Sequence, residues 1–189
     1  MPRTKEFGEK LREATRDKII NAAVALFAEN GLAGTSVSQI AKQAGISVGL
    51  MYHYYKTKEE IFAQLVEFAK KEVLEFAEAL NNEQSPKKTI LDIADEMVKE
   101  WQSGLEFSQW IILSNNLTDD ELSYHGTEFV SSLENLIKKG QKQGDFKAGD
   151  YKKMALFFLA MLEGVASLQL SMKGEFTPPT VEMITAFLM

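Results

Sequence analysis

Apolar residues recur at every third or fourth position along most of the chain, which is the spacing of helices with one buried face. The first of these helices has its apolar positions at Ile20, Ala23, Val24 and Phe27. Asn30-Gly31 ends it, because glycine can adopt the left-handed backbone that follows many helices. No run of alternating apolar residues is long enough to predict a strand, and the chain has only four prolines. The pattern therefore predicts an all-α protein.

Two short helices with the same spacing follow the first. Their apolar positions are Val37, Ile40, Ala41 and Ala44 in one, and Val48, Met51, Tyr52 and Tyr55 in the other. Ser36 and Gln39 match an S-x-x-Q capping box at the start of the earlier helix. Gly45 permits a tight turn between the two, and Ser47 caps the later helix. Three successive helices with such a turn predict a helix-turn-helix motif at residues 36–55.

The rest of the chain also has helical spacing. A long helix begins near Thr57, which forms a second capping box with Glu60, and runs to about Asn81. Ser85-Pro86 starts the next helix, since proline is favoured at the first helical position. Later helices are expected at 86–103, 105–114, 119–143 and 150–172, and from Thr177-Pro178 to Leu188. About nine helices are therefore expected, in an N-terminal domain (1–56), a connecting helix (57–84) and a C-terminal domain (85–189).

Charge is distributed unevenly along the chain. The net charge is −6, but residues 1–58 carry +4 and residues 59–189 carry −10. Affinity for a polyanion depends on the local basic patch rather than on the total charge, so this modest basic excess is consistent with nucleic-acid binding. The basic residues before the first apolar face are expected in a solvated tail, with a minor-groove arm as the alternative: Arg3, Lys5, Lys10, Arg12 and Arg16.

Composition argues against several other classes of protein. The absence of cysteine excludes disulfides and thiolate metal sites and fits a reducing cytoplasm, and the polar start predicts no signal peptide. Met154–Met172 is nearly long enough to cross a membrane. Glu163, Ser167 and Gln169 interrupt it, which favours a core or interface helix. We expect a cytoplasmic protein with no membrane association and no cofactor.

Two other classes of protein remain as alternatives: an enzyme, and a helical interaction protein that does not bind DNA. The chain has two histidines and lacks both a phosphate-binding loop and metal-ligand spacing, which counts against an enzyme. Turnover that survives deletion of residues 1–58 would favour the enzyme. An interaction protein would keep its activity after Lys58→Ala and Tyr52→Ala.

The last helix of the motif has a composition suited to the major groove of DNA. Its inner face is expected to be Val48, Met51 and Tyr55, and its outer face Gly49, Leu50, His53 and Tyr54. Glycine allows close approach, leucine can contact thymine methyl groups, and histidine and tyrosine can donate to bases or phosphates. Lys58 lies in the first turn of the following helix, where the helix N-terminus also attracts phosphate.

The segment TSVSQIAKQAGISVGLMYHYYKTKEEIF (35–62) resembles the signature of the TetR family of repressors. The preceding TRDKIINAAVALFAENGLAGTS (15–36) is similar to the first helix of that family. The shared features are the Ile-Ala pair of the second helix, the Ala-Gly-Ile-Ser turn, Tyr52, and the Lys58-Glu59-Glu60 start of the fourth helix. Downstream, LIKKGQKQGDFKAGDYKKMALFFLAMLEG (136–164) resembles the penultimate helices of the family.

The resemblance implies a homodimeric repressor with a DNA-binding head, which binds double-stranded operator DNA and releases it on binding a small, largely apolar effector. The DNA contacts that it implies are Ser36, Ser38, Val48, Gly49, Leu50, Tyr52, His53, Tyr54 and Lys58. Ser36 and Ser47 are helix caps first, with phosphate contact as an added role. Many members have Lys or Arg at Val48, Thr at Leu50 and Phe at Tyr55, and some have Arg at Ser38. Base readout is therefore expected to depend more on apolar contacts and DNA shape.

In the C-terminal domain, aromatic and methionine side chains fit an apolar effector cavity, although each one alone is more simply core packing. The candidates for this cavity are Met97, Trp101, Gln109, Trp110, Tyr124, His125, Phe129, Phe157 and Met161, with Asn115 and Glu163 as further polar groups. The apolar stripes of the last two helices fit a four-helix dimer interface. Its candidates are Phe158, Leu162, Val165, Ile184 and Phe187.

Overall fold

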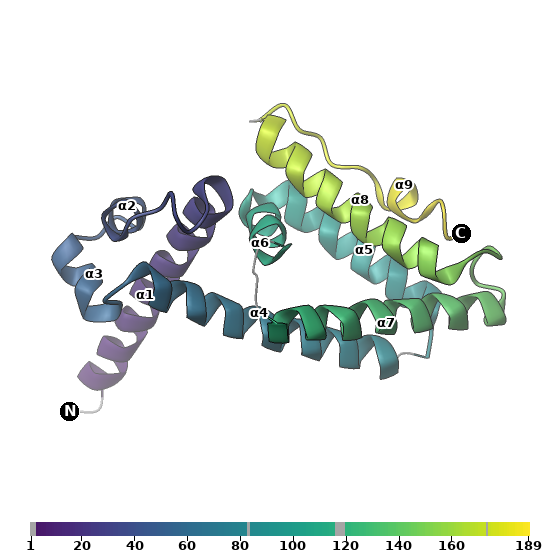
Figure 1. The fold of residues 1–189 in the computed structure, drawn as a ribbon, viewed down its shortest axis with the longest axis horizontal. Helices are drawn as coiled ribbons and strands as arrows, with labels where there is room; N and C mark the ends of the chain where they lie inside the picture. The colour runs from purple at the N-terminus through teal and green to yellow at the C-terminus, as the bar shows by residue number, and fades with distance from the viewer. Residues whose placement is uncertain (1–2, 83, 116–119, 173) are drawn as a thin grey trace. The chain divides into compact units, whose positions relative to one another are not determined.

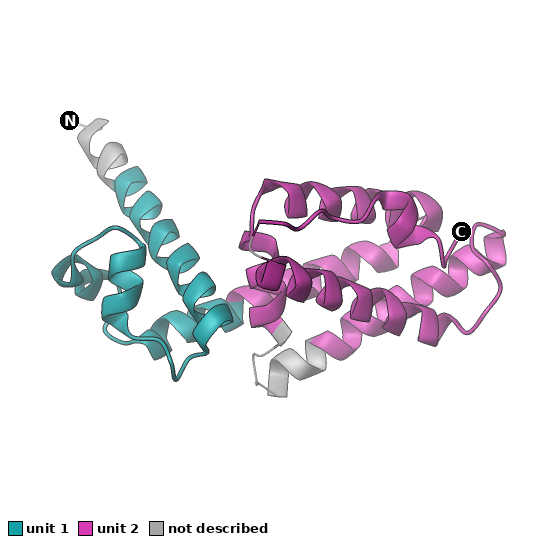
Figure 2. Cartoon of the chain, turned by 90° about the horizontal axis from the view of Figure 1, so that it is seen from above, with its two compact units in different colours: residues 1–67 teal, residues 68–189 magenta. Residues whose placement is uncertain are grey.

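The computed structural model describes residues 3–82, 84–115, 120–172 and 174–189, with side chains from residue 9 onward except at 115 and 120–125. Within these ranges the chain forms nine α-helices and no strand (Figure 1), which confirms the expected all-α class. The chain divides into two compact units, residues 1–67 and 68–189 (Figure 2).

Unit 1 contains the predicted helix-turn-helix. It consists of α1 (Arg3–Asn30), α2 (Val37–Gln43), α3 (Val48–Tyr54) and the start of α4 (Lys58–Asn82). Contacts of α1 with α2 and of α2 with α3 enclose its core. The buried side chains are apolar and come from all four helices: Ile19, Ala23, Phe27, Ile40, Met51, Ile61 and Leu65. The ring of Phe27 also meets Phe62 edge to face, at 5.8 Å between centroids.

Local capping signals set the ends of these helices. Ser36 and Gln39 form the complete capping box of α2, and the Ser47 hydroxyl accepts the N–H of Leu50 at 3.1 Å. Gly31 and Gly45 both adopt φ 69°, the left-handed conformation expected after a helix. At α4 the Thr57 hydroxyl accepts the N–H of Glu60 at 3.2 Å, as the predicted box requires, but the Glu60 carboxylate accepts the N–H of Lys56 rather than that of Thr57.

The expected N-terminal tail is wrong. Residues 3–18 continue α1, so the basic positions of this segment lie on a helix. Arg12 and Arg16 are four residues apart and exposed, which places both on one helical face.

Unit 2 is a bundle made from the remainder of α4 and five further helices. These are α5 (Pro86–Ser103), α6 (Glu106–Asn115), α7 (Asp120–Gln143), α8 (Tyr151–Met172) and α9 (Val181–Thr185). α8 packs against α6 and α7, and α5 packs against α9. The core of the bundle includes Ile90, Trp101, Leu133, Ile137, Phe158 and Ile184.

The last helix starts later than predicted. Thr180 caps it, with its hydroxyl accepting the N–H of Met183 at 3.3 Å. Thr177-Pro178 does not start it, because Pro179 follows and disfavours helical backbone at the residue before it. Ser85 precedes α5 as predicted, but its side chain makes no capping hydrogen bond.

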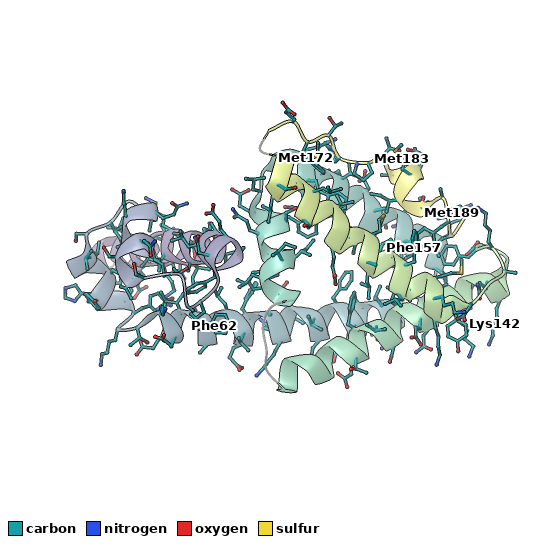
Figure 3. The ribbon with its side chains drawn as sticks, turned by 45° about the horizontal axis from the view of Figure 1, so that its top comes forward. Phe62, Lys142, Phe157, Met172, Met183 and Met189 are labelled. Carbon is teal, nitrogen blue, oxygen red and sulfur yellow. The ribbon has the colours of Figure 1, made fainter. Side chains whose placement is uncertain are left out.

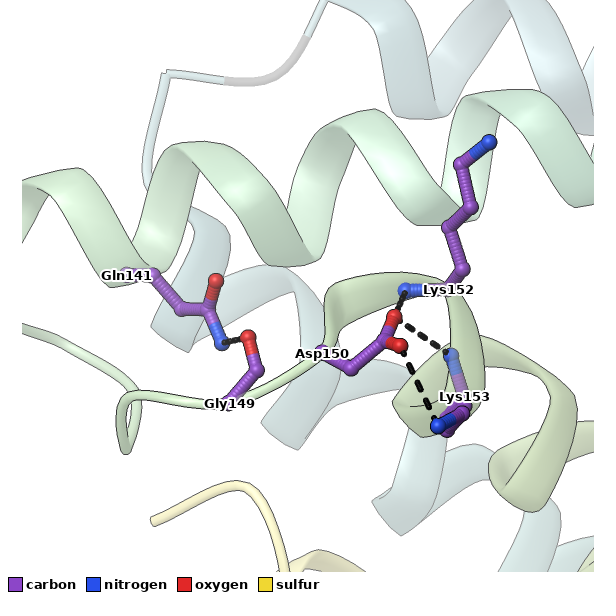
Figure 4. A network of polar contacts seen from close by, with 5 residues as sticks. All are labelled: Gln141, Gly149, Asp150, Lys152 and Lys153. Atoms are coloured by element: carbon purple, nitrogen blue, oxygen red, sulfur yellow. Dashed lines mark hydrogen bonds and ion pairs between the residues drawn. The ribbon is translucent and has the colours of Figure 1, made fainter.

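Asp150 caps the N-terminus of α8 (Figure 4). Its carboxylate accepts the backbone N–H groups of Lys152 and Lys153 at 3.1 and 3.3 Å, and lies 3.6 Å from the Lys153 ammonium. The Lys153 N–H is the main reason why the pKa of Asp150 falls below its ordinary value. Beside it, the Gln141 side-chain amide donates to the Gly149 carbonyl at 3.1 Å.

Among the described residues one helix, α8, has the length and hydropathy of a membrane span. A core helix of a bundle meets the same criteria. Gln169 of α8 is buried, donates to the carbonyls of Trp101 and Gly104 at 2.8 and 3.0 Å, and accepts the hydroxyl of Ser108 at 2.6 Å. These bonds join one face of α8 to the end of α5 and to α6, as in a packed bundle.

Candidate DNA-binding surface and ligand groove

The outer face of α3 is exposed and its inner face is held in the core of unit 1. Met51 and Tyr55 are buried as predicted, while Tyr52 is 54% exposed. Val48 was expected on the inner face, but it is 40% exposed, because the first residue of α3 lies beyond the edge of the core. The exposed surface of α3 therefore comprises Val48, Gly49, Leu50, Tyr52 and His53, with Tyr54 half-buried beside it.

Tyr55 links the end of α3 to α4. Its hydroxyl donates to the side-chain oxygen of Gln64 at 2.6 Å. Burial raises the pKa of Tyr55, so the phenol stays neutral and remains a donor in this bond. The bond fixes α3 within unit 1 and keeps the residues on its outer face in a defined orientation.

The two predicted cap serines are engaged within the protein. The Ser36 hydroxyl donates to Gln39 Oε1 at 2.7 Å and accepts the N–H of Gln39. Among the described residues the Ser47 hydroxyl only accepts, from the N–H of Leu50, and so caps the first turn of α3. Ser38 is exposed on α2, so its hydroxyl faces solvent near the start of that helix.

Lys58 has a different environment from the one predicted. Its ammonium group donates to the carbonyl oxygens of Leu32, Thr35 and Ala33 at 2.7, 2.9 and 3.5 Å. These carbonyls follow the end of α1, where no helical N–H reaches them. All three ammonium protons are thereby used within unit 1, so the Lys58 side chain holds the α1–α2 connection rather than presenting a free cation to phosphate.

A hollow of about 660 Å³ lies between α1 and α3. Its lining includes Glu9, Arg12, Glu13 and Arg16 from α1, and Leu50, His53 and Tyr54 from α3. Sequence reasoning placed the two arginines in a solvated tail, with a minor-groove arm as the alternative, and not beside α3. Their four-residue spacing, in phase with the helix that follows, was the signal that could have placed them beside α3.

Unit 2 contains a groove of about 520 Å³, called here the C-terminal groove. It is lined by Glu72, Val73, Phe76, Asp92, Ile93, Glu96, Met97, Glu100, Phe107, Trp110 and Phe129, which come from α4, α5, α6 and α7. Three predicted cavity residues, Met97, Trp110 and Phe129, meet in it. The ring of Phe129 packs against Phe76 at 5.5 Å, and that of Trp110 against Phe68 at 5.5 Å.

Other predicted cavity residues lie elsewhere. Trp101 and Met161 pack in or against the core of unit 2, and Gln109 does not line the groove. The indole N–H of Trp101 is buried without an acceptor among the described residues. Phe157 is 56% exposed on α8 and contacts Phe187, and Glu163 is exposed on the same helix. The side chains of Asn115, Tyr124 and His125 lie outside the described residues.

The predicted dimer-interface residues are largely core residues of a single chain. Phe158, Leu162 and Ile184 are buried in unit 2, and Val165 and Phe187 are partly buried against that core. α8 is apolar on most sides, so periodicity alone assigned the wrong face outward. The apolar side chains that α8 and α9 expose are Leu156, Phe157, Leu168, Met172 and Met183, of which Figure 3 labels Phe157, Met172 and Met183.

Comparisons with known proteins agree with this architecture. Residues 19–65 match the model of a family described as bacterial regulatory proteins, tetR family. Over 143 residues the chain is 27% identical to the probable HTH-type transcriptional regulator YttP of Bacillus subtilis (strain 168), covering 72% of this chain and 69% of that protein. Over 140 residues it is 29% identical to the fatty acid metabolism regulator protein of the same strain, covering 70% and 71%.

A solved structure shows the same fold over both units. The transcriptional regulator FadR from Bacillus subtilis in complex with stearoyl-CoA superposes with a TM-score of 0.58 and 21% identity, covering 91% of this chain and 95% of that one. These matches are to transcriptional regulators and not to enzymes. The helix-turn-helix domain at residues 19–65 is therefore of the TetR type of bacterial regulatory proteins, and the chain as a whole is similar to bacterial transcriptional regulators.

Proposed function

We propose that the chain is a cytoplasmic repressor that binds a palindromic operator as a homodimer and leaves it when a small molecule occupies the C-terminal groove. The observation that carries this proposal is the outer face of α3, which is exposed, apolar to weakly polar, and held rigidly by Met51 and Tyr55. A capped helix of this kind, preceded by a second short helix, fits the major groove of DNA.

The residues of α3 favour a readout with few strong hydrogen bonds. The added Cβ of an alanine at Gly49 would find only the Ser47 hydroxyl, at 4.0 Å, so the backbone there is open to close approach. Val48 and Leu50 present methyl groups suited to thymine methyls, and Tyr52 and His53 can donate to bases or phosphates. Arg12 and Arg16, beside α3, supply positive charge for the DNA backbone.

The exposed face of α8 supports dimerisation. Leu156, Phe157 and Leu168 lie on it, with the small residues Ala160 and Gly164 between them. An added Cβ at Gly164 would meet no atom within 4 Å, so a second helix can approach this part closely. A dimer formed through this face would present two α3 helices to the DNA, as half-sites one helical turn apart require.

The C-terminal groove supports regulation by a ligand. Its volume lies within the range of small-molecule sites, and aromatic and aliphatic side chains form most of its walls. A structurally similar regulator was solved in complex with stearoyl-CoA. A ligand can release the operator only if it binds more tightly to the DNA-free conformation of the protein.

The test is a gel shift on the promoter region next to the protein's own gene. The wild type should give a sequence-selective, salt-sensitive complex. The double variant Leu50→Ala/Tyr52→Ala should lose at least about tenfold in affinity, since both contacts lie on the reading face. Leu105→Ala, which truncates an exposed leucine of unit 2, is the matched control and should bind like the wild type. Equal loss in both variants, or no selective complex, would refute the proposal.

A further inference from the structure

The charges of the C-terminal groove have a single sign. Four of its lining residues are acidic, namely Glu72, Asp92, Glu96 and Glu100, and none of the described lining residues is basic. The remaining walls are aliphatic or aromatic. A ligand in this groove therefore meets an apolar surface bordered by carboxylates.

Two of the four carboxylates already have cationic neighbours. Asp92 pairs with Lys88, and Glu96 lies 3.9 Å from the Lys99 ammonium. Lys99 itself pairs more closely with Asp95, at 2.7 Å, on the side of α5 that does not line the groove. The charge of Glu96 is therefore only weakly compensated.

The other two carboxylates, Glu72 on α4 and Glu100 on α5, have no ion-pair partner among the described residues. Glu72 is exposed and Glu100 is half-buried. These two negative charges reach the groove from different helices. A positive charge held between these helices would be attracted by both.

The walls of the groove add a second attraction for the same charge. The faces of aromatic rings carry negative potential, and Trp is the strongest of the cation-binding rings. Trp110, Phe129, Phe76 and Phe107 all line the groove. An anion here would meet four carboxylates, of which only Asp92 and Glu96 have a cationic neighbour among the described residues, and no basic residue of the described lining, an arrangement that costs affinity through like-charge repulsion.

We propose that the C-terminal groove binds an amphiphilic organic cation, with an apolar aromatic or branched body and one positive charge, and discriminates against anionic thioesters. This inference rests on the proposed function, since it assigns a chemistry to the effector site named there. It also sets this chain apart from the similar regulator solved with stearoyl-CoA, whose ligand carries several phosphate charges.

The test uses two ions that have the same shape and opposite charge. Tetraphenylphosphonium and tetraphenylborate each carry four phenyl rings on a tetrahedral centre, and isothermal titration of the full-length protein measures their affinities. The cation should bind at least about tenfold more tightly than the anion. Stearoyl-CoA, added below its micelle concentration, should bind more weakly than the cation.

Variants of the groove carboxylates test whether the cation binds in the C-terminal groove. Glu72→Gln and Glu100→Gln should each weaken binding of the cation by about threefold to tenfold, because each removes one partly screened charge and preserves the shape of the side chain. Two controls remove charges on α4 outside the groove: Glu75→Gln, whose partner is Lys71, and Glu78→Gln, at an exposed position. Both controls should leave the affinity unchanged, and far-ultraviolet circular dichroism should show all four variants folded.

Three results would overturn the inference: binding of the borate or of stearoyl-CoA at least as tightly as the phosphonium, binding of neither ion, or equal weakening in the groove variants and the controls. Operator binding is measured separately, without any ligand. Failure to bind DNA would count against the proposed function and leave the charge preference of the groove intact, while release of the operator by an anion would support the function and refute the charge preference.

Discussion

At the scale of single residues, the size of one side chain can decide how closely two segments approach, and Gly140 is the clearest example. It is buried within α7, and its carbonyl accepts the N–H groups of Asp145 and Phe146 at 2.9 and 3.3 Å. A Cβ at this position would overlap the ring of Phe146, which is itself buried. The glycine is therefore required for close approach of the chain after α7, a role that composition could not reveal.

Gly140→Ala should lower the free energy of unfolding by about 1–3 kcal/mol, because the buried ring of Phe146 must shift. Gly126→Ala, in the same helix but with open space around the added methyl, should instead stabilise the protein by up to about 1 kcal/mol. Urea denaturation followed by circular dichroism compares the two. A destabilising effect of equal size at both positions would show that crowding by Phe146 is not the cause.

Lys58 makes its contacts within one unit. Lys58→Met keeps most of the apolar stem but removes the three bonds to carbonyls, so unit 1 should lose about 1–3 kcal/mol of stability. Amide hydrogen exchange in the α1–α2 connection would report the loosening. Unchanged exchange together with weaker DNA binding would instead favour the phosphate contact expected from the sequence.

At the scale of helices, the sequence predicted where helices begin and end better than which side of a helix is buried. Short-range signals such as Ser36 with Gln39, Ser47, and Gly45 act within three or four residues, and the structure contains each of them. The face of α8 depends on which neighbours it packs against, and its apolar residues surround the helix. Lys58 likewise reaches a carbonyl 26 residues away, a contact that no local pattern specifies.

The start of α8 should depend on pH through Asp150. The pKa of this carboxyl is lowered in the folded protein, mainly by the N–H of Lys153, so its contribution to stability is present above the unfolded pKa of about 4 and is lost as pH falls through the folded value. Asp150→Asn should therefore lower the melting temperature at neutral pH, with a difference that shrinks on acidification. A difference independent of pH would exclude the charge as its origin.

At the scale of the whole molecule, an apolar face on α8 is covered among the described residues only where Phe157 contacts Phe187. Leu156 is 65% exposed and Phe157 is 56% exposed. Neighbouring large apolar side chains are seldom this exposed in a monomeric protein. The candidates expected from periodicity, such as Phe158, turned out to lie in the core. The exposed face therefore replaces them as the proposed dimer contact.

Leu156→Glu should shift the protein from dimer to monomer, because it places a charge in an apolar interface. Sedimentation velocity at micromolar concentration measures the change. Leu105→Glu, at an exposed leucine outside α8, should leave the dimer intact. A monomeric wild type, or a dimer unaffected by Leu156→Glu, would contradict the proposed interface.

Nuclease footprinting of the protein on its own promoter region tests the central claim most directly. The account predicts a protected palindrome whose half-sites are one helical turn apart, about 10 base pairs, or a multiple of that spacing. Protection should disappear in the Leu50→Ala/Tyr52→Ala variant and persist in Leu105→Ala. A single unpaired site, or a footprint that survives the loss of the α3 side chains, would contradict the assignment of this chain as a dimeric repressor that reads DNA through α3.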